Sequence, residues 1–445
     1  MDRRAPDTLW RATAGPKPGF GRLEQNAEAE VVVIGGGFTG LSAALHLARR
    51  GIDVLLLEAR EIGWGASGRN AGFVVPNFSK ADPATVMARL GREKGRQLLD
   101  LVGRGGNRVF EIALEGELGR QAEQNGWLQP AHSAAMADTL RKRVQDWQDL
   151  GRPVRWLDAA ATAERTGMDI YHGALSDSSG GMINPLAYAR ALARLAVAAG
   201  VRIVEGAAVA DVKEAGSDWQ VETGETVVRA RKVLLCTNAE TEGAAARLAR
   251  QVIPLNVYQI ATEPLPSEMT ARFSPLREPV SDTRANIFTF RLDADNRLIS
   301  GGMAIVPLAA ERRMGKRIAR RLARELHLPE VPRVAHVWRG TAAVTTDFLP
   351  HIYRFGPGFL GATGCNGRGI AMTTMLGEVL ADAVKGTALD ELPVPVSEPA
   401  PIPFRRAARA APSLVLLKGL WDDWRTTRRT AAKALNTPTL KGENP

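Results

Sequence analysis

The sequence has 445 residues and a formal net charge of +10, from 58 Lys and Arg against 48 Asp and Glu. This length favours two or three domains. The sequence contains no run of 18 apolar residues, its basic N-terminus lacks the apolar stretch of a secretory signal, and its two cysteines are too few for a disulfide framework. We therefore expect a cytoplasmic protein, and the membrane-spanning and disulfide-stapled classes are excluded.

Residues 31–60 have the pattern of a dinucleotide-binding unit. A buried strand is predicted at 31–34, followed by Gly35-x-Gly37-x-x-Gly40, a helix with apolar residues at helical spacing, and a second strand that ends on Glu58. The glycines let backbone N–H groups approach a pyrophosphate, the helix N-terminus carries a partial positive charge, and the acid accepts hydrogen bonds from a ribose. The predicted contacts in this unit are Gly35, Gly37, Phe38, Thr39, Gly40, Glu58, Ala59 and Arg60.

A second glycine-rich loop, GWGASGRNAGF, follows at 63–73, where a simple NAD domain would continue into its next helix. Its small residues let a further stretch of backbone approach a ligand closely. The loop therefore favours FAD over NAD. Its predicted cofactor contacts are Gly65, Ala66, Ser67, Gly68, Arg69 and Asn70.

The middle of the chain predicts segments of two domains that alternate along the sequence. Residues 83–124 have helical apolar spacing, 126–132 predict a short strand, and 136–150 predict another helix. Asn184 followed by Pro185 predicts the start of a further helix. We expect the segments before residue 184 to separate the first part of the nucleotide domain from its second part, which begins with this helix.

Two buried strands, VRIVEG and KVLLCT, then return the chain to the nucleotide domain, where Val209, Thr237 and Asn238 are predicted to contact the cofactor. Residues 251–263 and 286–303 alternate apolar and polar residues, as a half-buried antiparallel sheet does. The predicted organisation is an N-terminal arm at 1–29, an FAD-binding domain at 30–78, 184–248 and 336–391, a substrate domain at 79–183 and 249–335, and a Pro-rich linker with a basic tail at 392–445.

Residues 356–384 predict a strand, a glycine-rich turn and a helix that begins near Arg368 and Gly369. A helix N-terminus this late in the chain suits the C2=O/N1 edge of an isoalloxazine, where negative charge gathers when a flavin is reduced. This segment also favours FAD. Its predicted contacts are Gly364, Asn366, Gly367, Arg368, Gly369 and Ile370.

Together these segments resemble the D-amino-acid-oxidase-like superfamily of FAD-dependent oxidoreductases, and within it the bacterial γ-glutamylputrescine oxidoreductase-like branch. Further matching motifs are LWRATAG at 9–15, GGMINP at 180–185, ATEPL at 261–265, ISGGM at 299–303, WRGTAAVTTDFLPHI at 338–352 and GATGCNGRGIAMTTMLGE at 361–378. The resemblance implies an α/β fold with a Rossmann-type FAD-binding domain and an interleaved antiparallel-sheet substrate domain of the α+β kind. It also implies an enzyme that oxidises a C–N bond in an amine or amino acid.

The resemblance also suggests catalytic candidates. Arg368 occupies the place of a basic residue beside the flavin's pyrimidine edge, and Arg69 falls in the loop that touches the flavin ring or its ribityl chain. Phe288, Phe290 and Arg291 come from the strand expected to roof the pocket. Tyr258 is a further candidate for the pocket, and His351 is expected either to pack or to support the site without contacting the substrate.

Three departures from the family pattern affect the expected chemistry. The Arg that grips the substrate carboxylate in glycine and D-amino-acid oxidases aligns with Ala342, which argues against a simple free α-amino acid unless Arg339 or Arg291 takes over. The cysteine that anchors flavin in sarcosine oxidases aligns with Gly340, so FAD is expected to be non-covalent. Ala371 replaces a lysine near the flavin, so rapid reaction with oxygen is not implied.

The predicted reaction is therefore oxidation of a secondary amine, a polyamine derivative or a cyclic imino acid to an imine, with oxygen or a quinone as electron acceptor. Such chemistry requires no metal and no Ser-His-Asp triad, because the cofactor performs the hydride transfer. Two alternatives stay open: an FAD-dependent monooxygenase that uses NAD(P)H, and a flavin-binding subunit of a larger electron-transfer complex. Oligomeric state is left open.

The C-terminal tail carries much of the charge imbalance. Residues 404–445 hold nine Lys and Arg against three acids, which is +6, and Leu414, Leu417, Leu420, Trp421 and Trp424 recur at helical spacing. A basic amphipathic helix of this kind either packs on the enzyme or lies on an anionic membrane surface, on the inner face of the cytoplasmic membrane. Packing is the favoured interpretation, and no nucleic-acid partner is expected because no binding motif accompanies the charge.

Overall fold

The computed structural model describes residues 7–306, 309–403, 413, 416–419 and 421. Its centre is a parallel sheet in the order β19-β12-β1-β2-β9, which the antiparallel strand β18 and then β20 extend. The strands of this sheet are β1 (Ala27–Ile34), β2 (Val54–Glu58), β9 (Arg202–Glu205), β12 (Thr226–Leu235), β18 (His351–Gly356), β19 (Phe359–Thr363) and β20 (Val396–Ser397).

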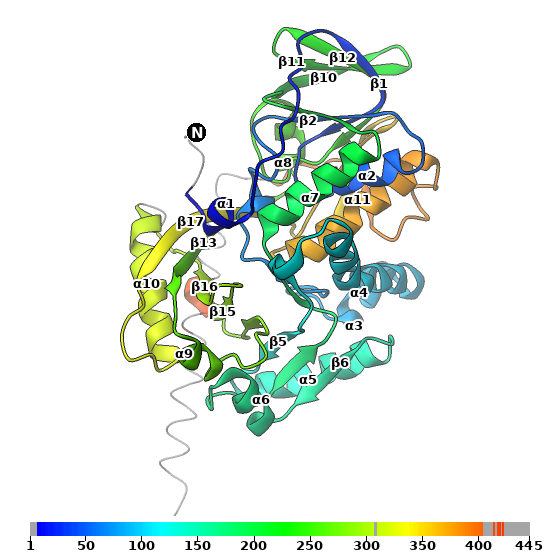
Figure 1. The fold of residues 1–445 in the computed structure, drawn as a ribbon. Coiled ribbons are helices and arrows are strands. Elements are labelled where there is room, and N and C mark those ends of the chain that lie inside the picture. Colours follow the sequence, from blue (N-terminus) through cyan, green and yellow to red (C-terminus); the bar gives the residue numbers. More distant parts are fainter. Residues whose placement is uncertain (1–6, 307–308, 404–412, 414–415, 420, 422–445) are drawn as a thin grey trace, which may run out of the picture.

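Side chains of the parallel strands are apolar on both faces, as expected for a sheet covered on both sides. On one face Val31, Val33 and Leu56 pack against helices α2 (Phe38–Ala48), α7 (Pro185–Ala198) and α11 (Gly369–Lys385). On the other face Val32 and Leu55 pack against β10 (Val209–Ala215) and β11 (Asp218–Thr223), which continue as an antiparallel meander into β12. Figure 1 shows this layered domain in the upper half of the molecule.

The second domain is built on an eight-stranded sheet in the order β17-β13-β16-β15-β14-β5-β7-β6. Its strands are β5 (Trp127–Pro130), β6 (Val154–Leu157), β7 (Ala174–Asp177), β13 (Ile253–Pro264), β14 (Val280–Ser281), β15 (Thr289–Leu292), β16 (Arg297–Gly302) and β17 (Val334–Val344). Helix α10 (Ala310–Glu325) covers β13, β16 and β17 along the edge of the molecule (Figure 1). The other helices of this half are α3 (Pro83–Leu90), α4 (Arg92–Glu115), α5 (Ala134–Gln148), α6 (Ala159–Thr166) and α9 (Ser267–Ala271).

Several short elements join the two domains. A small sheet has the strand order β3-β8-β4 and consists of β3 (Phe73–Val74), β8 (Gly181–Ile183) and β4 (Ala122–Glu123). The remaining helical elements are α1 (Leu9–Thr13), η1 (Ala66–Gly68), η2 (Gly119–Gln121), η3 (Gly243–Ala245) and α8 (Ala246–Ala249). None of the helices in the described part of the chain is long and apolar enough to cross a membrane.

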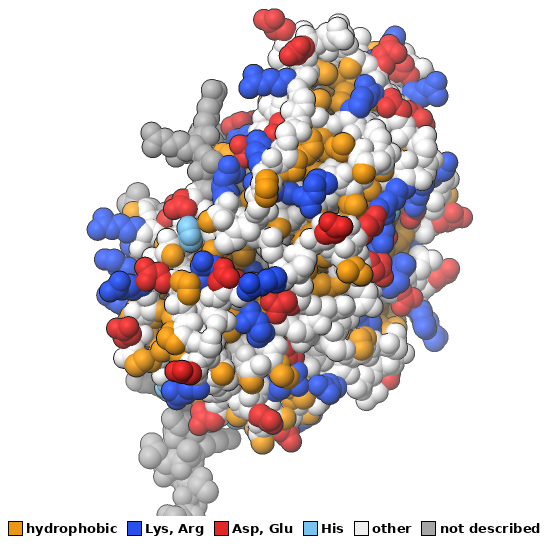
Figure 2. Space-filling view, viewed as in Figure 1, with side chains coloured by type: hydrophobic (Ala, Val, Ile, Leu, Met, Phe, Trp, Pro, Cys, Tyr) orange, Lys and Arg blue, Asp and Glu red, His pale blue; other side chains and the backbone are white. Residues whose placement is uncertain are grey.

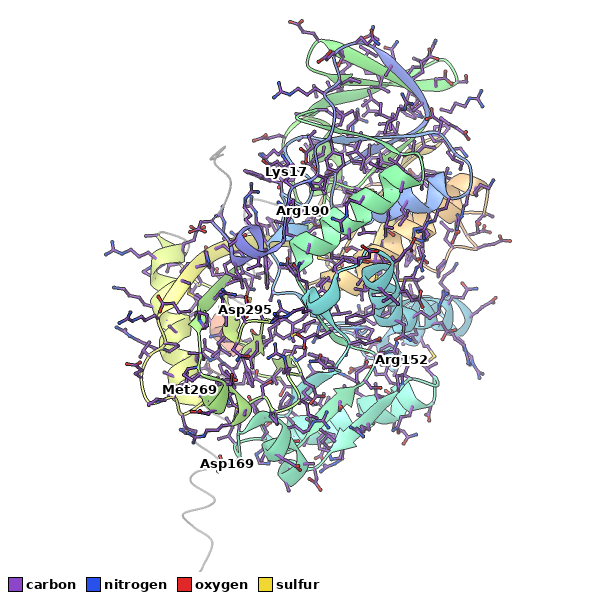
Figure 3. The ribbon with its side chains drawn as sticks, viewed as in Figure 1. Lys17, Arg152, Asp169, Arg190, Met269 and Asp295 are labelled. Atoms are coloured by element: carbon purple, nitrogen blue, oxygen red, sulfur yellow. The ribbon has the colours of Figure 1, made fainter. Side chains whose placement is uncertain are left out.

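The N-terminal arm is fixed to the nucleotide domain. Lys17 forms ion pairs with Glu61 at 3.3 Å and Glu205 at 3.0 Å, and Arg190 of α7 donates a hydrogen bond to the Gly15 carbonyl at 2.6 Å. Figure 3 labels Lys17 and Arg190 where the arm meets α7. The arm thereby carries α1 to the junction of the two domains.

The α/β fold expected from the sequence is confirmed, including α7, which Asn184 caps by accepting hydrogen bonds from the N–H groups of Leu186 and Ala187. One predicted domain boundary differs from the observed pairing. Residue 336 was expected to open the last part of the FAD-binding domain, but it lies inside β17, which pairs along its length with β13 in the second sheet. The return to the parallel sheet begins only with β18 and β19.

Candidate active site

The turn between β1 and α2 has room only for glycine at its two ends. A Cβ on Gly35, which has φ +111°, would lie 2.7 Å from the Cys236 carbonyl oxygen, and a Cβ on Gly40 would lie 2.0 Å from the Gly35 oxygen. Helix α2 begins without a side-chain cap, and the Phe38 N–H donates to Ser67 Oγ at 3.0 Å. The turn is therefore a close-packed cradle with a helix N-terminus, which suits a pyrophosphate.

The carboxylate of Glu58 is held at the end of β2. Its oxygens accept hydrogen bonds from the backbone N–H of Gly36 at 2.7 Å and of Arg60 at 2.8 Å. Burial raises the pKa of this carboxyl above its ordinary value. Nearby, just after the end of β12, the Thr237 hydroxyl is buried without a hydrogen-bond partner among the described residues. An acceptor fixed by the backbone and an unsatisfied hydroxyl are groups that a ribose and its phosphates would engage.

The loop 63–73 folds back on itself and contacts β17 of the eight-stranded sheet. Arg69 Nε donates to the Trp64 carbonyl at 2.8 Å, and its guanidinium lies 5.3 Å from the Trp64 ring centre. The Arg69 carbonyl accepts a hydrogen bond from Trp338 Nε1 at 2.9 Å, and the Asn70 carbonyl accepts one from Trp10 Nε1 at 2.8 Å. Two tryptophans thus fix the backbone of the predicted flavin loop, while Arg69 acts mainly within the loop.

The late glycine-rich turn is organised by Asn366. Asn366 has φ +49°; its side chain accepts from the Thr345 N–H at 2.9 Å and donates to the Gly364 carbonyl at 2.8 Å. Gly364 and Gly367 also have positive φ values, of +100° and +83°. Arg368 is the residue that precedes α11, and no side chain caps that helix. The turn therefore presents an open helix N-terminus together with a guanidinium.

Arg368 has no anionic partner in the described part of the chain. Its guanidinium carbon lies 4.7 Å from the Trp127 ring centre, and burial lowers its pKa. The lowered pKa, about 9, still leaves the guanidinium charged at neutral pH. A desolvated cation stacked on an indole and lacking an acid favours binding of an anionic group, such as a carboxylate or the electron-rich edge of a reduced flavin.

Arg291 of β15 is a second buried cation. It is 3% exposed, its Nη2 donates to the Ile183 carbonyl at 3.1 Å, and its guanidinium carbon lies 4.9 Å from the Trp10 ring centre. Its Nε has no hydrogen-bond partner in the part of the chain that the structure describes, and burial lowers its pKa to about 10. Arg291 therefore retains unused hydrogen-bonding capacity between the flavin loop and the domain junction.

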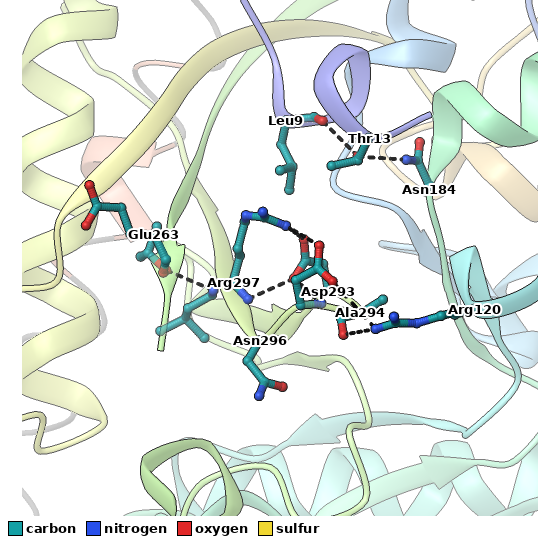
Figure 4. Close-up of polar contacts among 12 residues, drawn as sticks. Leu9, Thr13, Arg120, Asn184, Glu263, Asp293, Ala294, Asn296 and Arg297 are labelled. Atoms are coloured by element: carbon teal, nitrogen blue, oxygen red, sulfur yellow. Dashed lines mark hydrogen bonds and ion pairs between the residues drawn. The ribbon is translucent and has the colours of Figure 1, made fainter. Parts of the chain in front are cut away.

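Arg291 lines a cavity of about 370 Å³ at that junction, together with residues of α1, η2, β8 and the turn between β15 and β16. Figure 4 shows the polar contacts around it: Asn184 donates to Thr13 at 3.0 Å, and Arg297 pairs with Asp293 at 3.0 Å. Figure 3 labels Asp295 on the same turn. The acidic residues at the rim of this cavity form ion pairs with arginines, whereas Arg291 forms no ion pair with any described residue.

The eight-stranded sheet separates the predicted pocket residues onto two faces. Tyr258 and Phe290 are buried in the cluster that packs on α10 with Met314 and Ile318, and Phe288 is in the same cluster. Because side chains alternate along a strand, their neighbours Gln259 and Arg291 face the other way. Contrary to the sequence-based expectation, Tyr258 and Phe290 therefore lie on the face of the sheet that packs against α10.

The other face carries residues that the sequence reasoning did not select. Trp338 of β17 is opposite Gln259 of β13, and Gln259 is opposite Gly301 of β16. Gln259 is buried, and no described residue forms a hydrogen bond with its Oε1. On β5, Trp127 donates to Ser281 at 2.8 Å. Arg291 lies on the same face of the sheet as Gln259, Trp338 and Trp127. Counting every second residue along the strand from Arg291 would therefore have identified this face.

The remaining predicted positions fall around this centre. Gly340 lies against the flavin loop, since a Cβ there would be 3.2 Å from the Arg69 oxygen. Asn238 has φ +53° and donates to the Thr341 carbonyl at 3.2 Å, while Val209 begins β10 in the apolar core of the nucleotide domain. His351 pairs with Asp347 at 2.9 Å on β18, which agrees with a packing role.

The arrangement fits FAD. Three segments that are distant in sequence could bring their backbone close to a cofactor: the 35–40 turn, the 63–73 loop and the 364–369 turn. Each contains a glycine at which a Cβ would clash, and the two turns each lead into a helix whose N-cap residue provides no side-chain cap. Two residues that each have a buried polar atom without a hydrogen-bond partner among the described residues adjoin these segments, because Thr237 lies near Gly35 and Arg291 lies near Gly72. These are the residues that would hold the dinucleotide and the flavin.

Comparison with known proteins agrees with this geometry. Residues 30–383 match the family described as FAD dependent oxidoreductase. The chain is 29% identical over 417 residues to γ-glutamylputrescine oxidoreductase of Escherichia coli (strain K12), covering 92% of this chain and 97% of that protein. It is 30% identical over 396 residues to the probable oxidoreductase OrdL of Rhizobium meliloti (strain 1021), covering 87% and 91%.

Among solved structures, L-proline dehydrogenase from P. horikoshii superposes with a TM-score of 0.69 at 21% identity, covering 83% of this chain and 96% of that one. This likeness concerns the fold. The family match and the relatives confirm the predicted family and FAD as the cofactor. The chain belongs to the family of FAD-dependent oxidoreductases.

Proposed function

We propose that this enzyme oxidises a C–N bond of a small amine, amino acid or imino acid to an imine, which water then hydrolyses. The observation that carries the proposal is Arg368, a desolvated guanidinium on Trp127 without an anionic partner in the described part of the chain. A substrate carboxylate or the flavin's pyrimidine edge would supply the missing charge. The amine oxidoreductase named above, the E. coli relative, supports the same reaction class.

When bound, FAD supplies the hydride acceptor, and the residues of this chain supply binding and orientation. Arg368 would hold negative charge, and Gln259 Oε1, which is buried and unpartnered, would accept a hydrogen bond from the substrate N–H. Trp127 and Trp338 are buried and would help to exclude water from this face of the sheet. Exclusion of water strengthens both polar interactions, because the local dielectric is low.

The proposed substrates are secondary amines, polyamine derivatives such as γ-glutamyl-polyamines, and cyclic imino acids. At the position on β17 where a guanidinium would be expected to bind a free α-carboxylate through two hydrogen bonds, this chain has Ala342. The buried Arg291 lies on a different strand, β15. We propose non-covalent FAD, because Gly340 offers no side chain for a covalent link. Oxygen or a quinone is the proposed acceptor, in the cytoplasm. The basic tail lies largely outside the described residues, and its packing on the enzyme stays the favoured expectation over contact with a membrane.

The decisive experiment is anaerobic mixing of the holoenzyme with γ-glutamylputrescine, sarcosine, proline, pipecolate and D-amino acids. We expect at least one amine to bleach the flavin absorbance. Bleaching by NADPH and by none of the amines would contradict the proposal and support the monooxygenase alternative. No bleaching by any of them would support the alternative of a subunit that receives electrons elsewhere.

Acid precipitation tests the mode of attachment. We expect all the yellow colour to pass into the supernatant. Colour that stays with the precipitated protein would show a covalent flavin and contradict this part of the proposal.

A further inference from the structure

Helix α10 carries a concentration of positive charge that flavin chemistry does not use. Its 16 residues contain seven Lys and Arg and two Glu, a net +5. One face, with Met314, Ile318 and Leu322, is buried against the eight-stranded sheet. The opposite face is exposed and cationic, so α10 is an amphipathic basic helix attached to a rigid sheet. Blue side chains gather in Figure 2 along the edge of the molecule that α10 forms in Figure 1.

Four of these cations are exposed and have no ion-pair partner among the residues that the structure describes: Arg312, Lys316, Arg317 and Arg320. Three of them, Arg312, Lys316 and Arg320, are spaced four residues apart and form one row on the helix surface. Like charges at this spacing repel one another and destabilise a helix. The row therefore costs stability in the free protein, and an anionic surface would relieve that cost.

Exposed apolar side chains flank the cationic row. Val306 precedes α10 and is 53% exposed, and its carbonyl accepts a hydrogen bond from Arg313 at 2.5 Å. Val331 follows the helix and is 51% exposed. Ile287 is 37% exposed, and its carbonyl accepts a hydrogen bond from Arg321 at 3.2 Å. Exposed cations on the helix, with exposed apolar residues before and after it in the sequence, are a combination that suits a lipid interface.

A described part of the C-terminal segment lies against the same region. Ser413 donates to the Ile305 carbonyl at 3.0 Å, and a Cβ on Gly419 would lie 2.3 Å from Ala285 Cβ. Leu417 in this segment is 47% exposed. The segment thus adds exposed apolar surface close to the residues that flank α10.

We propose that the exposed face of α10 binds an anionic lipid surface, with Arg312, Lys316, Arg317 and Arg320 at the headgroups and Val306 and Val331 at the level of the acyl chains. Clusters of four or more Lys and Arg on an amphipathic helix attract anionic lipids through their headgroup charge. A nucleic acid would satisfy the cations equally well but would gain nothing from the aliphatic residues, because single-strand binding relies on aromatic stacking. The proposal concerns a surface separate from the flavin site and stands independently of the proposed reaction.

The test compares two four-residue variants of the holoenzyme that remove the same charge. One replaces Arg312, Lys316, Arg317 and Arg320 with Gln, and the matched control replaces Arg92, Arg96, Arg104 and Lys142, which are exposed cations of α4 and α5, with Gln. We expect wild type and the control to co-sediment with phosphatidylglycerol-containing vesicles and not with phosphatidylcholine vesicles. The α10 variant should bind at least ~30-fold more weakly, while its FAD content stays that of wild type.

A second pair of variants separates lipid from other polyanions. Val306→Ser with Val331→Ser should weaken vesicle binding, whereas Leu114→Ser with Val197→Ser, which changes exposed apolar residues on α4 and α7, should not. Equal binding by the two four-residue variants would overturn the proposal, because net charge alone would then be responsible. Binding of transfer RNA with negligible vesicle binding would overturn it as well and assign the face to nucleic acid.

Discussion

In the parallel sheet both faces are apolar and buried, whereas the eight-stranded sheet has one apolar face against α10 and one face with Gln259, Arg291 and Trp338. In the proposed function, the first sheet contributes mainly through backbone at its carboxyl ends, and the second sheet contributes through side chains. A one-residue change in strand register would leave the chemistry of the first sheet's glycine turn intact but would exchange the two faces of the second. The comparison shows where function depends on main-chain shape and where it depends on side-chain direction.

The largest effect should follow from adding one methyl group to the glycine turn between β1 and α2. We expect Gly40→Ala to abolish FAD binding and to lower the free energy of unfolding by ~4 kcal/mol, because the new Cβ would stand against a fixed carbonyl. Flavin absorbance after gel filtration and urea unfolding measure both. Gly19→Ala is the control, since nothing lies within 4 Å of its Cβ position. Retention of FAD by Gly40→Ala would show that the turn can relax.

A buried carboxyl of the second domain should make stability depend on pH. Asp282 is 1% exposed, and burial raises its pKa from 3.8 to about 6. The folded state binds the proton of Asp282 more tightly than the unfolded state does, so protonation stabilises the fold. This stabilisation is complete below about pH 4 and is lost as pH rises through 6, which lowers the free energy of unfolding by ~3 kcal/mol. Urea unfolding across that range should show the loss in wild type, and Asp282→Asn should remove most of it. Parallel curves for the two proteins would contradict the assignment.

Removal of the unpaired guanidinium tests the side-chain-based part directly. We expect Arg368→Met to lower kcat/KM about 100-fold for the amine that bleaches the flavin, because a charge-assisted hydrogen bond is lost. Arg368→Lys should recover part of the activity, since it restores the charge without the fork of donors. If Arg368→Met lowers activity only in proportion to lost FAD, the residue holds the cofactor and not the substrate.

The smallest effects distinguish the two faces of the eight-stranded sheet. Tyr258→Phe, on the α10 face, should change kcat/KM less than about twofold, whereas Gln259→Leu, one residue away, should lower it about tenfold through the loss of one buried acceptor. Steady-state kinetics with the same amine measure both. A large loss in Tyr258→Phe would mean that its hydroxyl reaches the substrate despite its place in the α10 cluster.

Prediction from sequence succeeded where local pattern determines structure. The glycines at 35–40, Glu58 and the Asn184 cap each have requirements set by a few neighbouring residues, and the structure shows the strand, turn, helix and cap at those positions. The late helix at 369–385 was equally accessible, because Gly364 and Gly367 mark the turn before it.

Prediction was weaker where long-range pairing decides. Tyr258 and Gln259 are equally plausible pocket residues by type, and only the pairing of β13 with β16 and β17 determines which faces α10. The extent of β17 could not be predicted either, since its partner β13 is about 80 residues away in sequence. The charge of α10 was visible in the sequence, but its exposure depends on which face the sheet covers.

The discontinuity of the nucleotide domain has a consequence for biosynthesis. β12 pairs on one side with β1 and on the other with β19, and α11 packs against α2. The ribosome therefore makes the first glycine turn more than 300 residues before the helix that completes the flavin site. Until residue 385 has emerged, the nascent chain lacks one wall of its cofactor site. FAD capture is thus a late event, and chains that stall before that point should accumulate without cofactor and with the α2 face uncovered.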